Sequence, residues 1–329
     1  MKNFNGKNVL FFCPKFFDYE KEIQKTFEEL GAKVIWFDDR PSNGFFSKSL
    51  IRINKSIINN RIERYYEKIL EKLSASAINF DYVFFLNPET ITIAYIKKIR
   101  QKYSHAKFIL YMWDSFNNRR KTLQLLPFFD SKFTFDPDDA KKYNLNFRPL
   151  FYVANYSQKK MEIKYDLVFV GTAHTDRMAL VKRITAPLFK FNVKLYFFLS
   201  SKMLFWAKKI TDRRFRKIPY KEISFVPLNH LAISNLIHQS IAVLDINHPR
   251  QIGLTMRTFE ALGAQKKLIT TNADVVNYDF YDQDNILIIS RNNPIVNEDF
   301  LTRPFNTYSK EILFKYSIRG WLAELFKLV

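Results

Sequence analysis

The chain has 329 residues, which is enough for two domains of about 150 residues each rather than for one ordinary core. Hydrophobic residues make up 47% of it and aromatic residues 17%, with only 7 glycines and 12 prolines, so the composition excludes extensive disorder and long flexible linkers. A formal net charge of +20 indicates an anionic partner, which can be a phosphate-bearing substrate, an anionic lipid or a nucleic acid.

Cysteine content and hydropathy indicate the compartment. Cys13 is the single cysteine and lies in an apolar run, so we expect a small buried side chain in a reducing environment rather than a nucleophile. No signal peptide is expected before the first strand, and the apolar runs end well short of the ~20 residues of a membrane span. We therefore expect a cytoplasmic protein that is soluble or peripheral to the inner face of the cytoplasmic membrane.

Residues 1–155 alternate short apolar runs with longer helical patterns, which predicts a Rossmann-like domain with a parallel sheet between helices. We expect strands at 9–13, 34–37, 82–86, 108–112 and 132–135. A helix at 19–30 ends at Gly31, and a long helix at 49–73 carries apolar residues with a period of 3.6.

Polar residues that directly follow these strands are the candidates for chemistry, because ligands of open α/β sheets lie outside the carboxyl ends of the strands. Asp114 follows the strand at 108–112 and stands beside Trp113, so it is the candidate general base for transfer of a group to a hydroxyl; a helix N-cap is the equal alternative. Glu89, after the strand at 82–86, is a rival carboxylate or a first-turn helix charge. Lys15, after the first strand, is a candidate contact for an acceptor phosphate.

An Asp-x-Asp spacing occurs at Asp136 and Asp138, as in some divalent-metal sites. Proline followed by acidic residues is also typical of a helix start, and we favour that interpretation. No paired cysteine or His-x-x-x-His pattern indicates zinc, so we predict no metal.

A polar connection near 156–164 is the predicted domain linker, and residues 165–307 form a second Rossmann-like domain. We expect strands at 165–171, 193–199, 241–245, 268–270 and 286–289, helices at 176–188, 230–239 and 253–262, and a terminal helical segment at 308–329. Gly171, Thr172 and His174 follow the first of these strands and can reach a phosphate or a sugar hydroxyl, although a lone histidine after a strand is more often a capping or packing residue. No Gly-x-Gly-x-x-Gly occurs, which argues against a nicotinamide enzyme.

Residues 202–221 contain eight basic residues and one acid, Asp212, and begin with the apolar run Met203-Leu204-Phe205-Trp206. An aromatic and apolar patch joined to a basic cluster is what adhesion to an anionic membrane surface requires. Two alternatives remain open: a solvated basic face over a core helix, and RNA binding, for which no recognisable motif is present.

The segment 250–272 reads as loop, helix and strand. Gly253 permits close backbone approach, Thr255 can cap the helix, and the free N–H groups of its first turn suit a diphosphate. Arg257 adds a bidentate positive charge, and Glu260 shares its helix face, where a carboxylate can bind two ribose hydroxyls. The alternative is an exposed ion pair between Arg257 and Glu260. Further candidate nucleotide-sugar contacts are Arg250, Gln251, Leu254, Thr271 and Asn272.

This segment resembles the nucleotide-binding stretch of GT-B-fold glycosyltransferases, in particular the CgeB-like and the capsular or lipopolysaccharide-type bacterial enzymes, and the resemblance covers residues 165 to 290 best. It implies two Rossmann-like domains facing a cleft and a last helix that crosses back to the first domain. It also implies a nucleotide-diphosphate sugar as donor, no metal or other cofactor, and a glycan or lipid-linked acceptor. By motif, ribose binding falls on Glu260 and diphosphate binding on residues 253–257.

Two other function classes stay open on the sequence. A sugar-nucleotide epimerase of the same fold would keep the nucleotide site without an acceptor surface. A non-catalytic basic module would bind a membrane or RNA, although we expect no nucleic acid partner.

Overall fold

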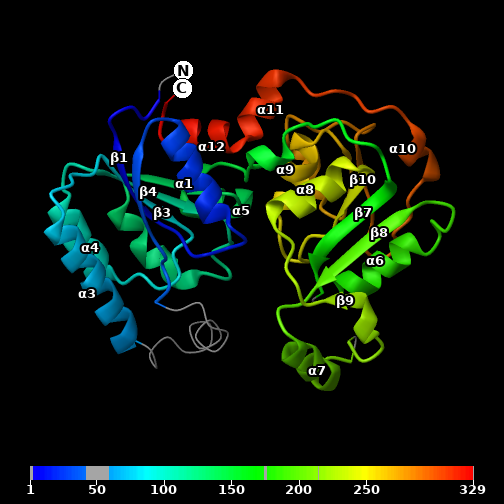
Figure 1. Cartoon of the computed structure of the whole chain (residues 1–329), viewed down its shortest axis with the longest axis horizontal. Helices are drawn as coiled ribbons and strands as arrows, with labels where there is room; N and C mark the ends of the chain where they lie inside the picture. Colours follow the sequence, from blue (N-terminus) through cyan, green and yellow to red (C-terminus); the bar gives the residue numbers. More distant parts are fainter. Residues whose placement is uncertain (1–2, 42–58, 174–175, 214, 329) are drawn as a thin grey trace. The chain divides into compact units, whose positions relative to one another are not determined.

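The computed structural model describes residues 3–41, 59–173, 176–213 and 215–328, and its internal contacts divide the chain into two compact units. Unit 1 comprises Met1–Pro149 and Arg319–Val329, and unit 2 comprises Leu150–Ile318. The division lies on the N-terminal side of the predicted linker at 156–164, and the end of the chain belongs to unit 1 (Figure 1).

Unit 1 is built on a six-stranded sheet in the order β2-β1-β3-β4-β5-β6, with every pairing parallel. Its strands are β1 (Asn8–Phe12), β2 (Lys33–Phe37), β3 (Tyr82–Leu86), β4 (Lys107–Met112), β5 (Ser131–Thr134) and β6 (Asn146–Phe147). The five predicted strands are confirmed to within one residue at each end, and the short β6 was not predicted. The direction of sheet growth reverses between β1 and β3, which is where ligands of such sheets bind.

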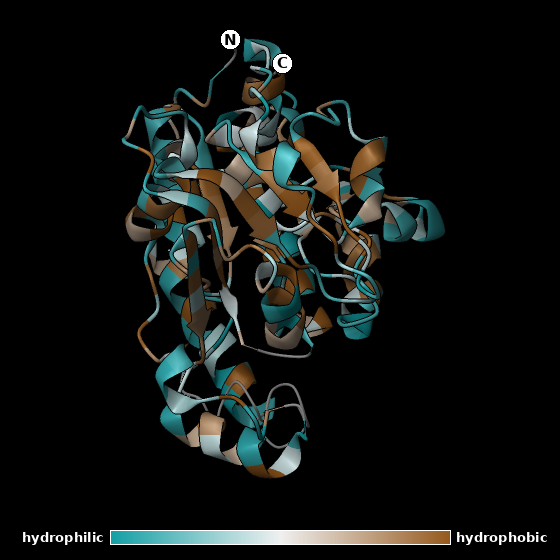
Figure 2. Cartoon of the chain, turned by 90° about the vertical axis from the view of Figure 1, so that its right-hand side faces the viewer, coloured by the Kyte–Doolittle hydropathy of each residue, from teal (hydrophilic) through white to brown (hydrophobic). Residues whose placement is uncertain are grey.

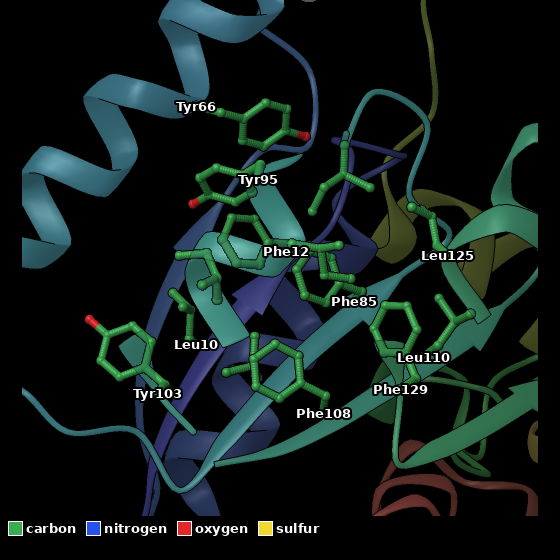
Figure 3. Close-up of a cluster of buried hydrophobic side chains, with 14 of the residues drawn as sticks. Leu10, Phe12, Tyr66, Phe85, Tyr95, Tyr103, Phe108, Leu110, Leu125 and Phe129 are labelled. Atoms are coloured by element: carbon green, nitrogen blue, oxygen red, sulfur yellow. The ribbon is translucent and has the colours of Figure 1, made fainter. Parts of the chain in front are cut away.

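Helices cover both faces of this sheet. They are α1 (Tyr19–Glu29), α3 (Asn59–Ala75), α4 (Ile93–Lys102), the 3-10 helix η2 (Arg120–Phe128), α5 (Pro137–Tyr143) and α12 (Ile318–Leu325). Of the predicted helix at 49–73, the part before Asn59 lies outside the described residues. On one face, α3 and α4 pack on alternate side chains of the strands, such as Phe12 and Phe85, whose rings stack 4.6 Å apart (Figure 3).

On the opposite face, α1 and the chain terminus cover the other set of strand side chains. Trp321 of α12 is fully buried, with ring centroids 6.0 Å from Phe84 and 4.9 Å from Tyr111. The ring centroid of Phe326 lies 5.2 Å from that of Phe27 in α1. The last helix therefore completes the core of unit 1, as the predicted fold required.

The terminal segment is not one helix. α11 (Lys310–Tyr316) and α12 are separated at Ser317, which forms a parallel bridge with Tyr152. The N–H of Tyr152 donates to the carbonyl of Tyr316 at 3.0 Å, and the N–H of Ile318 donates to the carbonyl of Tyr152 at 2.9 Å. These backbone groups are thereby withdrawn from helical pairing, so the helical pattern at 308–329 breaks there.

Unit 2 contains a second parallel six-stranded sheet, in the order β12-β11-β10-β7-β8-β9. Its strands are β7 (Tyr165–Thr172), β8 (Val193–Phe198), β9 (Ile223–Ser224), β10 (Ser240–Asp245), β11 (Lys267–Thr270) and β12 (Ile286–Ile288). Its helices are η3 (Ala154–Tyr156), α6 (Arg177–Thr185), α7 (Lys202–Thr211), η4 (Tyr220–Glu222), α8 (His230–His238), α9 (Met256–Gly263), η5 (Ala273–Asn277), α10 (Glu298–Thr302) and α11. Counted from β7, the strand order is 3-2-1-4-5-6, the Rossmann order, and its switch point lies between β7 and β10.

The cores of both units follow from hydropathy. Strands are almost uniformly apolar, because a parallel sheet is buried on both faces, whereas the flanking helices alternate polar and apolar residues (Figure 2). None of the helices in the described part of the chain combines the length and hydropathy that crossing a bilayer requires.

Candidate functional site

At the switch point of unit 2, Asp245 ends β10 and organises the start of α9. Its buried carboxylate oxygen Oδ2 accepts hydrogen bonds from the hydroxyl groups of Thr255, at 2.7 Å, and Thr258, at 2.9 Å. The sequence analysis did not select Asp245, although its place at the end of a buried strand marked it for attention. This carboxylate fixes the helix start against the edge of the sheet.

Thr255 is the N-cap of α9. It is extended, and its Oγ1 accepts a hydrogen bond from the N–H of Arg257 at 3.1 Å. The helix begins at Met256 rather than at the predicted 253, because the extended cap residue ends the preceding loop and Leu254 is buried there, with 1% of its surface exposed. The positive end of the helix dipole lies beside the carboxyl ends of β7 and β10, because Thr255 bonds to Asp245 and Arg257 bonds to the carbonyl of Val170. The N–H groups of Arg257 and Thr258 donate to Thr255.

Arg257 and Glu260 form an ion pair within α9. The pair is buried rather than exposed, since the side chains are 16% and 4% accessible. Arg257 also donates from Nη2 to the carbonyl of Val170 in β7 at 3.3 Å, which ties the helix to the switch point. Burial raises the pKa of the neighbouring Tyr156, and the charge of Glu260 raises it further.

Two further arginines reach the same place. Arg177, in the first turn of α6, donates to Thr172 Oγ1 at 3.2 Å. Arg291, beyond β12, donates to Asp176 Oδ2 at 3.1 Å and also binds the carbonyl of Asn247. Burial lowers the pKa of Arg177; the charge of Asp245 opposes this shift, whereas the charges of Arg291 and Arg257 add to it.

Arg177 and Arg257 both bond to the end of β7 and Arg291 bonds to the loop after β10, so the three guanidinium groups gather at the switch point of unit 2. Gathering like charges in a partly desolvated place is unfavourable unless counter-charges lie nearby; here Glu260 pairs with Arg257, Asp176 pairs with Arg291, and the charge of Asp245 acts on Arg177. The sequence analysis found Arg257 and missed the other two. Arg177 was recognisable as a first-turn residue of the helix after β7, whereas only the return of the chain through β12 brings Arg291 close.

Several residues predicted to contact the nucleotide-sugar instead form hydrogen bonds to or within the loop that precedes α9. Thr271 donates to Asn247 Oδ1 at 2.7 Å, Asn247 donates to the carbonyl of Gln251 at 2.9 Å, and Gln251 donates to the carbonyl of Gly253 at 2.8 Å. Asn272 donates to the carbonyl of Ile252 at 2.8 Å. These bonds hold the loop in one shape beside the helix start.

Arg250, Gly171 and His174 are the remaining residues of unit 2 that were predicted to contact the nucleotide-sugar. Arg250 is exposed, and its side chain is available to solvent. A Cβ at Gly171 would lie 2.7 Å from the ring of Phe169, so this glycine is required by internal packing. His174 lies outside the described residues.

At the switch point of unit 1, Glu89 sits in a buried ion network. Its carboxylate accepts two hydrogen bonds from Arg40, at 3.0 and 2.7 Å, and one from Arg119 at 2.6 Å, and its side chain is 5% exposed. Arg119 also donates from Nε to Asp114 at 3.0 Å, and the Asp114 side chain is 31% exposed. The two candidate carboxylates are thus linked by one arginine, and Asp114 is the accessible one.

The buried carboxylate of Asp39 holds the backbone at Glu89 in place. Its Oδ2 accepts hydrogen bonds from the backbone N–H of Glu89 at 2.5 Å and of Thr90 at 2.7 Å, and Tyr66 donates to its Oδ1 at 2.8 Å. Burial raises the pKa of Asp39 to about 6, although the two backbone donors oppose that shift.

The Asp-x-Asp segment has a structural use. Asp136 is the N-cap of α5 and accepts hydrogen bonds from the N–H groups of Asp138 and Asp139, and Asp139 accepts the N–H of Phe116 at 2.8 Å. Among the residues that the structure describes, no three histidine, cysteine or acidic side chains form a group that could hold a metal ion.

No protein-family model and no curated protein sequence matches the chain. Solved structures do. HepE of Anabaena, in complex with UDP and glucose, aligns with a TM-score of 0.61 and 11% identity over 98% of this chain and 100% of that chain. AviGT4, a glycosyltransferase involved in avilamycin A biosynthesis, aligns with a TM-score of 0.56 and 11% identity over 98% and 96% of the two chains.

The UDP-GlcNAc 2-epimerase of Methanocaldococcus jannaschii aligns with a TM-score of 0.50 and 11% identity over 97% of this chain and 99% of that chain. At such low identity, these likenesses show the fold. The chain has the GT-B architecture of two Rossmann-like units, each with a parallel six-stranded sheet.

Proposed function

We propose that the protein is a glycosyltransferase that moves a hexosyl or related group from a nucleotide-diphosphate sugar to an acceptor hydroxyl. The observation that carries this proposal is the gathering of Arg177, Arg257 and Arg291 around the capped start of α9 at the switch point of unit 2. A diphosphate offers these guanidinium groups further negative charge and further oxygen acceptors.

The donor is held by two kinds of contact. The arginines and the first-turn N–H groups of α9 bind the diphosphate and stabilise it as it leaves, so that fixed positive charges take the place of a metal ion. Glu260, one turn along, binds the ribose hydroxyls in exchange for part of its pairing with Arg257. A uridine nucleotide is the donor class we favour, because the HepE structure is a complex with UDP and the epimerase is named for a UDP-sugar.

Asp114 is the base that accepts the proton of the acceptor hydroxyl. Its partial exposure supports this assignment over Glu89, whose oxygens accept from two arginines. We further propose a membrane-linked acceptor of surface-polysaccharide or lipopolysaccharide assembly, the class implied by the resemblance to CgeB-like and capsular enzymes, and an enzyme that works at the inner face of the membrane. The excess of 52 basic over 32 acidic residues suits such an anionic surface.

Calorimetric titration with UDP and with inorganic pyrophosphate tests the donor site. If Glu260 binds ribose, Glu260→Gln weakens UDP binding and leaves pyrophosphate binding unchanged, whereas Arg257→Gln weakens both. Equal loss of both ligands in Glu260→Gln would contradict the ribose role. Absence of UDP binding by the unmodified protein, together with a failed screen of other nucleotide-sugars, would overturn the proposal.

A second function has a specific observation in its favour, since the M. jannaschii epimerase shares the fold over 97% of this chain. The two reactions leave different products. A transferase releases the nucleoside diphosphate and consumes acceptor, whereas an epimerase returns an intact nucleotide-sugar with one ring carbon inverted. Proton NMR of the sugar-nucleotide after incubation with each donor therefore distinguishes them.

A further inference from the structure

Helix α7 of unit 2 presents an apolar stripe to solvent. Met203 and Trp206 are each 58% exposed, and Ile210 is 74% exposed. Their spacing of three and then four residues places them on one side of the helix. Large apolar side chains at this level of exposure, gathered on one helix face, mark an interaction surface rather than scattered surface residues.

The stripe is rigidly supported from within unit 2. Phe205 is fully buried and contacts Phe215 and Tyr220, with ring centroids 5.7 and 5.4 Å away. Tyr220, which is 42% exposed, stacks on Trp206 at 6.3 Å with an interplanar angle of 20°. The exposed tryptophan and tyrosine thus extend the stripe from a fixed base.

Basic residues are frequent in the segment that carries this stripe. Lys209 donates to the carbonyl of Arg216 at 2.7 Å, which folds the segment after α7 back along the helix. The acidic residue within 202–221 is Asp212. The described basic residues of the segment are Lys202, Lys208, Lys209, Arg213, Arg216, Lys217 and Lys221.

We infer that this α7 surface, made of Met203, Trp206, Ile210 and Tyr220 with those basic residues, inserts into the headgroup region of an anionic lipid bilayer. Exposed apolar side chains gain free energy by entering the boundary between the headgroups and the acyl chains. Tryptophan and tyrosine are the residues that favour this interface. Lysine and arginine around them gain from the negative surface potential. Aliphatic Met203 and Ile210 would add nothing to RNA binding, which uses base stacking and phosphate contacts.

This inference does not depend on the proposed transferase activity, because α7 contributes none of the residues that surround the start of α9. Binding of the full-length chain to vesicles tests it. Sedimentation with vesicles of phosphatidylcholine mixed with phosphatidylglycerol should retain the protein, and vesicles of phosphatidylcholine alone should retain much less. Raised salt should weaken the binding, since the attraction of exposed charges is screened.

The decisive variant is Trp206→Ser with Ile210→Ser. We expect its partition onto the mixed vesicles to fall at least about tenfold, because two large apolar side chains no longer enter the bilayer. Phe189→Ser is the matched control, since Phe189 is 81% exposed in the same unit but outside the α7 surface, and it should bind as the unmodified protein does. Lys217→Ser with Lys221→Ser should lose binding to mixed vesicles, whereas Lys159→Ser with Lys160→Ser, a second exposed pair, should not.

Insertion of Trp206 itself is measured by quenching with brominated lipids. The chain has four tryptophans, so the loss of quenching in Trp206→Phe assigns the signal. Undiminished vesicle binding in the serine double variant, or binding to single-stranded polyuridylate in place of vesicles, would overturn the inference. An unchanged circular dichroism spectrum and cooperative thermal unfolding show that the serine variant is folded, whether or not the donor site binds UDP.

Discussion

Arg177→Met is the sharpest test of the anion site, because it separates a binding charge from a structural one. In the free protein, Arg177 is partly desolvated, the charges of Asp245, Arg291 and Arg257 act on it, and it donates a hydrogen bond to the neutral hydroxyl of Thr172. Methionine has a similar length and no charge. We expect the free energy of unfolding to change by less than about 2 kcal/mol, because removal of the desolvation and of the repulsion by Arg291 and Arg257 offsets the lost hydrogen bond to Thr172 and the lost attraction to Asp245.

Ligand binding should change in the opposite direction. A hydrogen bond between a charged guanidinium and a diphosphate contributes about 1.5–3 kcal/mol, so the Kd for UDP should rise about 10- to 150-fold. At a UDP concentration of about 100 times the original Kd, the ligand-induced stabilisation should fall from about 2.7 kcal/mol to between about 0.3 and 1.4 kcal/mol.

Thermal unfolding with and without UDP, combined with calorimetric titration, measures both quantities in one protein. Arg183→Met is the control, because Arg183 lies on the same helix and contacts the carbonyl of Asn292 instead. It should leave the Kd unchanged. If Arg177→Met lowers the free energy of unfolding by more than about 2 kcal/mol while the Kd is retained, Arg177 is a structural residue and the anion site is misassigned.

Three further variants test unit 1. Glu89→Gln should lower the free energy of unfolding by about 3–5 kcal/mol, because Arg40 and Arg119 lose a buried counter-charge. If this variant instead loses turnover and keeps its melting temperature, Glu89 rather than Asp114 is the base. Asp39 has a folded pKa of about 6 against an ordinary value of 3.8, so its contribution to stability is present below pH 4 and is lost as pH rises through 6. Relative to Asp39→Asn, the unmodified protein should therefore lose about 2 kcal/mol between pH 4 and pH 7 in urea titrations, and parallel pH profiles of the two proteins would refute this. Trp321→Ala should cost about 3–5 kcal/mol in the same assay, and a loss below about 1 kcal/mol would show that α12 is not part of the core.

Local patterns in the sequence determined most of the helices and every strand except the two-residue strands β6 and β9. A buried parallel strand must be an apolar run of a few residues, so β1, β3, β4 and β10 were recognisable to within a residue. The cap at Thr255 was equally local, because its hydroxyl needs only the N–H groups that follow it in the chain. Residues after each strand were the right places to look for polar groups, since parallel strands bring their carboxyl ends to one edge.

Tertiary structure decided which of those polar groups meet and what they do. Arg291 reaches the start of α9 through the position of β12, and Glu89 meets Arg40 across the switch point of unit 1; both depend on strand order, which no local pattern contains. The same holds for Ser317, where pairing with Tyr152 overrides a continuous helical pattern. Burial settled the character of the ion pair between Arg257 and Glu260, because spacing along a helix places two side chains together without fixing how much water reaches them.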